Sequence, residues 1–138
     1  MTRISVGLWV LLISALPACG HRPATHVQPT LRTILISEVV QPEVLYTTAG
    51  EEIRWQNVRS SPVRLGFLSM RLLDDLACEK GISTFFGQVN DLITIPPGES
   101  ISLCLVRSGD LQYNVWFDEK NPKGTISRTA TVRVEKRG

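Results

Sequence analysis

The chain has 138 residues, of which 43% are hydrophobic, and its formal net charge at neutral pH is +2. A chain of this length forms one ordinary domain with a single core, so we expect no second domain. The near-zero net charge argues against nucleic acid as a partner.

The first residues predict an export signal. Residues 4–16 form a mostly apolar run of 13 residues behind Arg3, whereas a membrane-spanning helix needs about 20 apolar residues. A run of this length is typical of the hydrophobic region of a signal peptide. We therefore expect residues 1–18 to be a signal peptide that is cleaved off.

The residues around the expected cleavage site carry a resemblance. Leu16, Pro17, Ala18 and Cys19 resemble the lipobox of bacterial lipoproteins, in which the cysteine is joined to diacylglycerol. The resemblance implies lipidation of Cys19, although Pro17 stands where the motif more often has a small or β-branched residue. Ordinary secretion fits less well, because Leu16 lies three residues before the cut. The implied location is the periplasmic side of the cell envelope, at the outer membrane in preference to the inner one.

Residues 19–30 are predicted to be the lipid anchor and a flexible linker. The segment after Cys19 is polar, contains two prolines and shows no apolar periodicity, and fully extended it reaches about 35 Å. Its two histidines, His21 and His26, offer an alternative function, a periplasmic protein that handles copper or zinc. Two imidazoles without a fixed third ligand make a weak site, so we interpret them as solvated linker residues.

Residues 31–138 predict an all-β domain. Short alternating runs are separated by turn residues at intervals typical of an antiparallel β-sandwich. In residues 111–117, Trp116 lies on the face opposite Tyr113, where it is either exposed or covered by the segment that follows Cys78. The expected strands are residues 31–40, 44–48, 52–58, 63–68, 92–95, 101–107, 111–117 and 125–135.

One stretch predicts a different structure. Met70, Leu73 and Ala77 recur at helical spacing, which indicates a short helix over residues 70–79. Residues 81–91 are then expected to form a loop held by Cys78.

Two cysteines remain once Cys19 is assigned to the lipid. Cys78 and Cys104 are an even number in an oxidising compartment, which favours one disulfide, with two buried thiols as the alternative. The disulfide would fix the loop over an outer sheet surface, where we expect a partner-binding surface with Phe85, Phe86 and Trp116 as contacts.

Three stretches in order resemble the cupredoxin family of plastocyanin-like Greek-key sandwiches. They are the segment 49–57 (AGEEIRWQN), the turn 95–100 (IPPGES), and the segment 109–113 (GDLQY) leading to residues 124–126 (GTI). The resemblance covers roughly residues 31–135 and implies an antiparallel Greek-key β-sandwich.

The copper ligands of that family do not stand at the matching positions. A blue-copper site needs two imidazoles, a thiolate and usually a methionine. The first histidine is expected after the pattern Asn57-x4-Pro62, where this sequence has Val63. The cysteine is expected after Tyr113, where it has Asn114 and Val115. Near the position expected for the second histidine stands Asp118. The resemblance therefore implies the fold without a copper cofactor.

The residue inventory argues against an enzyme. A serine or cysteine nucleophile activated by histidine requires a folded histidine, and the sequence has none after His26. The neighbouring Asp74 and Asp75 are better interpreted as a solvated surface than as an acid–base pair. We therefore predict a non-catalytic binding or assembly module, attached to the membrane by its N-terminal lipid, whose partner is an unidentified envelope protein.

Overall fold

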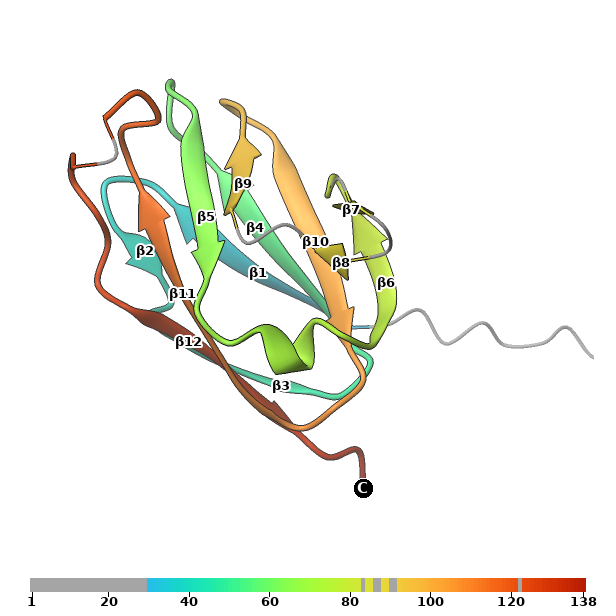
Figure 1. The fold of residues 1–138 in the computed structure, drawn as a ribbon. Helices are drawn as coiled ribbons and strands as arrows, with labels where there is room; N and C mark the ends of the chain where they lie inside the picture. Colours follow the sequence, from blue (N-terminus) through green and yellow to red (C-terminus); the bar gives the residue numbers. More distant parts are fainter. Residues whose placement is uncertain (1–29, 83, 86–87, 90–91, 122) are drawn as a thin grey trace, which may run out of the picture.

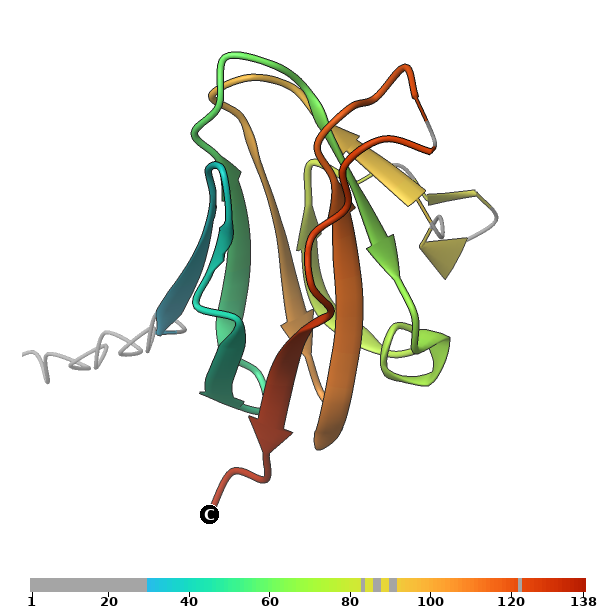
Figure 2. The same cartoon turned by 90° about the vertical axis from the view of Figure 1, so that its left-hand side faces the viewer.

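The predicted β-sandwich is confirmed. The computed structural model describes residues 30–82, 84–85, 88–89, 92–121 and 123–138. Two five-stranded sheets face each other, and a small two-stranded sheet lies beside them (Figures 1 and 2). Within the described residues, no helix is both long and apolar enough to cross a membrane.

The first sheet, called sheet A, has the strand order β2-β1-β4-β10-β6. Its strands, in that order, are Val40–Gln41, Leu31–Ile36, Glu52–Asn57, Ser100–Leu105 and Leu76–Lys80. The second, called sheet B, has the order β3-β12-β11-β5-β9. Its strands are Val44–Thr48, Ala130–Glu135, Gly109–Trp116, Val63–Phe67 and Leu92–Ile95. The two-stranded sheet pairs β7 (Thr84–Phe85) with β8 (Gln88–Val89).

Two strand pairings correct the expectation of a purely antiparallel sandwich. Strand β1 runs parallel to β4, and β3 runs parallel to β12. Parallel neighbours need a crossover connection, and the chain supplies one by leaving sheet A after β2 and entering sheet B as β3. The change of sheet occurs at the cis peptide bond between Gln41 and Pro42.

The core forms from the inward-facing alternate residues of both sheets. Trp55 of β4 is fully buried and meets Phe67 and Tyr113 edge to face, with ring centroids 5.7 Å and 5.6 Å apart. Burying side chains of this size contributes about 1.5–3 kcal/mol each. The aromatic contacts therefore join β4 of sheet A to β5 and β11 of sheet B.

The predicted helix over residues 70–79 is wrong for most of its length. Only Met70–Leu72 is helical, as one turn of 3-10 helix η1, and Leu76–Lys80 is strand β6. The edge of β10 offers residues 76–80 backbone hydrogen-bond partners, and a ladder of such bonds outweighs a weak helical pattern. Within the predicted loop 81–91 lie β7 and β8.

A buried carboxylate closes the turn between β3 and β4. Glu51 accepts hydrogen bonds from the Thr48 amide at 2.9 Å and the Thr47 hydroxyl at 2.8 Å, and it pairs with Arg32 at 3.3 Å. These interactions, the Thr48 amide first, hold the pKa of Glu51 below its usual value of 4.5. Ala49 and Gly50 form the turn, and Gly50 has a φ of 88°, which favours glycine.

Candidate functional site

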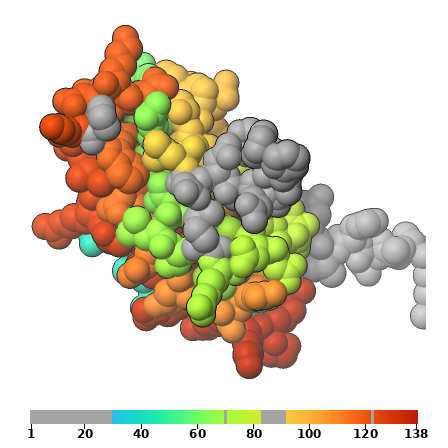
Figure 3. Space-filling view, viewed as in Figure 1, coloured from blue at the N-terminus to red at the C-terminus, as the bar shows by residue number. Residues whose placement is uncertain are grey.

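The candidate site lies at one end of the sandwich, which we call the loop end. It carries the β1–β2 turn (37–39), the β4–β5 loop (58–62), the β9–β10 turn (96–99) and the β11–β12 connection (117–129). Figures 1 and 2 show the β4–β5 loop, the β9–β10 turn and the β11–β12 connection at the top of the molecule, with the β1–β2 turn below them. In the space-filling view, the β11–β12 connection projects from the body of the domain at the upper left (Figure 3).

Asn57, the last residue of β4, organises the loop end from inside. Its side chain is fully buried, and Nδ2 lies 3.0 Å from the carbonyl oxygens of Ser61 and Ile95 and 3.1 Å from that of Pro96. Its Oδ1 accepts a hydrogen bond of 3.0 Å from the Arg59 amide. One amide group thus fixes the β4–β5 loop against the β9–β10 turn.

Arg59 joins three of the loops. Its guanidinium donates to the Ser37 carbonyl at 3.2 Å and pairs with Glu38 at 2.9 Å. The same group lies 5.1 Å from the centroid of the Phe117 ring, within cation–π range. The Arg59 side chain is only 18% exposed, whereas that of Glu38 is 89% exposed. The contacts with the Ser37 carbonyl and the Phe117 ring therefore hold the loop end together more than the ion pair does.

The positions that correspond to copper ligands hold residues that do not fit copper. Val63 and Val115 are fully buried in the core, and their side chains have no atom that can ligate a metal. Asp118 is exposed, and Met70 belongs to η1 at the opposite end of the sandwich (Figure 1). Among the residues that the structure describes, no three of His, Cys, Asp or Glu lie close enough together to hold a metal ion.

An open groove of about 580 Å³ runs beside the loop end, between residues 38–43 and the β11–β12 connection. Its apolar lining includes Val39, Phe117 and Ile126. Val39 and Ile126 are 52% and 46% exposed, and Val58 on the β4–β5 loop is 53% exposed. Single exposed apolar side chains are common, whereas several from neighbouring loops at one end of a domain make that end a candidate interaction surface.

Trp116, a predicted partner contact, lies on the outer face of sheet B. The predicted alternation is confirmed, because its neighbours Val115 and Tyr113 point into the core while Trp116 is half-buried. Its indole lies across β5, over Gly66.

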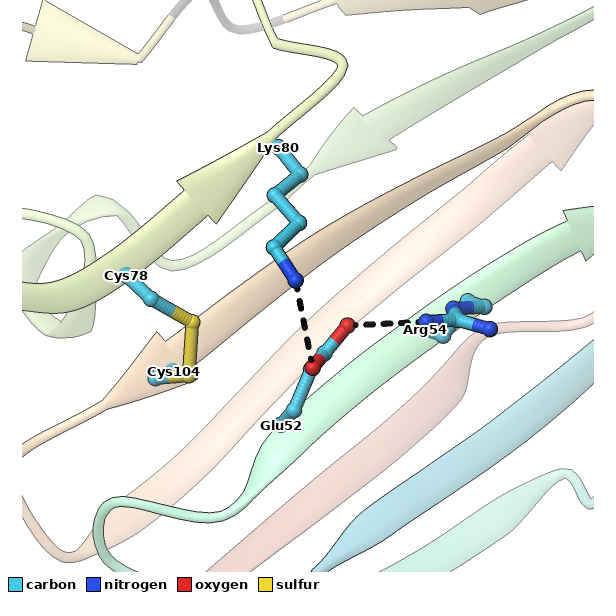
Figure 4. The surroundings of a disulfide bond; sticks show 5 residues. All are labelled: Glu52, Arg54, Cys78, Lys80 and Cys104. Atoms are coloured by element: carbon cyan, nitrogen blue, oxygen red, sulfur yellow. Dashed lines mark hydrogen bonds and ion pairs between the residues drawn. A yellow bond between two sulfur atoms is a disulfide. The ribbon is translucent and has the colours of Figure 1, made fainter. Parts of the chain in front are cut away.

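The predicted disulfide between Cys78 and Cys104 is confirmed. We had expected the disulfide to fix a loop over the outer surface of a sheet. The two cysteines are instead direct partners in the β6–β10 ladder, so the bond fixes an edge strand to its own sheet. Beside it, Glu52 lies between Arg54 at 3.1 Å and Lys80 at 3.7 Å (Figure 4). The pKa of Glu52 is lowered by the Ser102 hydroxyl, Arg54 and Lys80. We interpret these charged side chains on the face of sheet A as a structural ionic cluster.

The other predicted site residues are not tested by the structure. Cys19, both linker histidines and Phe86 lie outside the described residues. Phe85 is in β7, and its contact with a partner stays a prediction.

Sequence reasoning missed Arg59 and Gly66. Nothing in the sequence distinguishes Arg59 from a solvated arginine, because its partners come from distant loops. Gly66 did carry a signal, since a glycine inside a strand often marks the close approach of another group.

Comparisons with known proteins bear on the fold alone. No family model and no curated protein matches the sequence. Among solved structures, the chain is similar to three amicyanin variants. One, a reduced variant, is 14% identical in sequence and has a TM-score of 0.54. A second, a copper(I) form, is also 14% identical and has a TM-score of 0.53. Each of these two similarities covers 80% of this chain and 87% of the amicyanin chain. The third, another copper(I) form, is 15% identical and has a TM-score of 0.51, and the similarity covers 75% of this chain and 80% of the amicyanin chain. The predicted cupredoxin-like fold is therefore confirmed.

Proposed function

We propose that this protein is a lipid-anchored binding or assembly module of the cell envelope, built on a copper-free cupredoxin-like fold. One observation carries the proposal. At the loop end, the positions of metal ligands are filled by the buried Val63 and Val115, whereas the surface above them presents half-exposed apolar side chains.

The proposed docking surface consists of Val39, Val58 and Ile126, from three different loops. Asn57 and Arg59 hold these loops in place through the contacts described above. A surface that is ordered before binding loses less conformational entropy when a partner arrives. The partner that fits is a folded envelope protein with an apolar patch, because these side chains offer mainly apolar area to a partner.

The tether belongs to the proposal as well. Lipidation of Cys19 would hold the domain at the membrane, and residues 20–30 would let it stand up to about 35 Å away. This reach suits a module that meets a partner protein beside the membrane.

Photo-crosslinking from position 126 tests the docking surface, using the full chain with its native signal expressed in a bacterium. We expect a discrete crosslinked product that is lost when Val58→Asp is added. Val106→Asp is the matched control, since Val106 is an exposed valine in the β10–β11 turn, at the opposite end of the domain. A product that survives Val58→Asp, or one lost equally in both variants, would overturn the docking surface.

Intact mass of the detergent-extracted protein, with elemental analysis alongside, tests the anchor and the copper-free state. We expect acylated Cys19 and no stoichiometric copper. An unacylated chain would contradict the proposed lipid anchor, and stoichiometric copper would contradict the proposed copper-free state.

A further inference from the structure

A second hollow lies on the outer face of sheet B, on the other side of the β11–β12 connection from the groove. It has a volume of about 240 Å³ and is lined by Arg64, Leu92, Trp116, Asp118 and Glu119. In Figure 3 the surfaces of β5 (green), β9 (amber) and β11 (orange) meet on this face. Pockets for drug-sized ligands measure about 300–1,000 Å³, so this hollow suits a single side chain or a similarly small group.

The floor of the hollow is apolar and depends on a glycine. A Cβ atom at Gly66 would lie 2.5 Å from Cζ3 and 3.0 Å from Cη2 of Trp116, and 3.4 Å from Cδ1 of Leu92. The absence of a side chain therefore lets the indole lie close to strand β5, next to Leu92. Leu92 is 43% exposed, so the indole and the leucine offer an open apolar surface to a ligand.

The rim of the hollow is acidic. Asp118 and Glu119 contribute two carboxylates against the single guanidinium of Arg64. The Lys120 amide donates a hydrogen bond of 3.1 Å to Oδ1 of Asp118, which orients that carboxylate. Neither acid forms an ion pair with any residue in the described part of the chain, so both are available to a cationic ligand.

We infer that this hollow binds the side chain of a lysine presented by a partner. The aliphatic stem of the lysine would cover Trp116 and Leu92, and its ammonium group would meet Asp118 and Glu119. An aromatic face attracts an ammonium group as well as its methylene stem. An anionic ligand would meet two like charges, and a wholly apolar one would leave the acidic rim without a partner.

This inference goes beyond the proposed function and does not depend on it. The hollow shares no lining residue with the groove at the loop end. Failure of the docking surface would leave the lysine site standing, and the reverse also holds.

The test is a titration of the full chain in detergent with Nα-acetyl-lysine N-methylamide, followed by NMR at the tryptophan indole N–H groups. The norleucine analogue is the matched ligand control, because it keeps the stem and lacks the ammonium group. We expect the lysine compound to shift the Trp116 signal and to leave the signal of the buried Trp55 in place. Equal binding of the norleucine compound, or no shift of Trp116, would overturn the inference.

Charge variants sharpen the test. Asp118→Asn with Glu119→Gln should raise the dissociation constant by about tenfold, as expected for the loss of two exposed ion pairs. Arg64→Gln should lower it by about threefold, because it removes the one repelling charge. Unchanged affinity in the double variant, or weaker binding in Arg64→Gln, would contradict an ammonium site.

Discussion

Asn57→Ala is the substitution that we expect to weaken the loop end most. Alanine removes the buried amide that contacts three carbonyl oxygens and the Arg59 amide. Because the side-chain NH2 group has two hydrogens, one of its three contacts is shared. The variant therefore leaves about two carbonyl groups and one backbone amide without their partner.

The expected loss in the free energy of unfolding follows from the cost of leaving these polar groups without hydrogen-bond partners. A buried polar group that loses its hydrogen-bond partner costs about 1–3 kcal/mol. Water can reach parts of the loop end, so the low end of the range applies, and three groups together cost about 3 kcal/mol. With a urea m-value of about 2 kcal/mol per M, the unfolding midpoint falls by roughly 1.5 M.

Asn114→Ala is the matched control. Asn114 is also buried, but its Nδ2 has only two contacts, the Ser127 carbonyl at 3.1 Å and the Thr129 hydroxyl at 3.3 Å. We expect Asn114→Ala to lower the free energy of unfolding by about 1 kcal/mol. Equal losses in the two variants, or a loss below about 1 kcal/mol for Asn57→Ala with unchanged m-value, would refute the role assigned to Asn57.

Three further predictions concern other parts of the domain. Because hydrogen bonds lower the pKa of the Glu51 carboxyl below 4.5, this carboxylate contributes its full stabilisation above pH 4.5 and loses it as the pH falls through the lowered pKa. In urea unfolding, Glu51→Gln should therefore be less stable than the parent at pH 7, and the difference should narrow as the pH falls below 4.5. Replacing Cys78 and Cys104 by serine, which opens a loop with a sequence separation of 26, should cost about 3.5 kcal/mol in the chain-entropy model, measured by the same unfolding assay, and a loss near zero would contradict this. Gly66→Ala should displace the indole of Trp116, whose Cζ3 would lie 2.5 Å from the new Cβ, and move its fluorescence to longer wavelength; an unchanged spectrum would show that the indole does not lie over β5.

Strand positions were predictable wherever alternation was regular. Residues 44–48 and 92–95 are strands with the predicted bounds, because each alternates between core and solvent. The predicted strand 125–135 begins only at Ala130. Before Ala130, Ile126 forms an isolated bridge to Trp116. Residues 125–129 therefore have no continuous partner strand and belong to the β11–β12 connection.

Pairing partners could not be predicted from local patterns. The parallel neighbours β1 and β4 are separated by a strand in the other sheet, and no short-range signal records that crossover. The same limit explains the helix error, since the apolar spacing around Leu73 and Ala77 says nothing of the open edge of β10 that receives β6. The candidate site depends on such distant contacts even more, because Arg59 meets residues 37, 38 and 117.

The loop end shows how this chain keeps ordered loops without imidazole or thiolate side chains at the matching positions. Burial of Val63 and Val115 contributes about 1.5–3 kcal/mol each, whereas imidazoles buried there without hydrogen bonds or a metal would cost free energy. The loops above are then fixed by groups of the chain itself, the Asn57 amide and the Arg59 guanidinium. Side chains in the described part of the chain therefore supply the contacts that order the loop end. Under the proposed function, a partner that docks on Val58 and Ile126 would therefore meet loops that the Arg59 guanidinium and the Asn57 amide already hold in place.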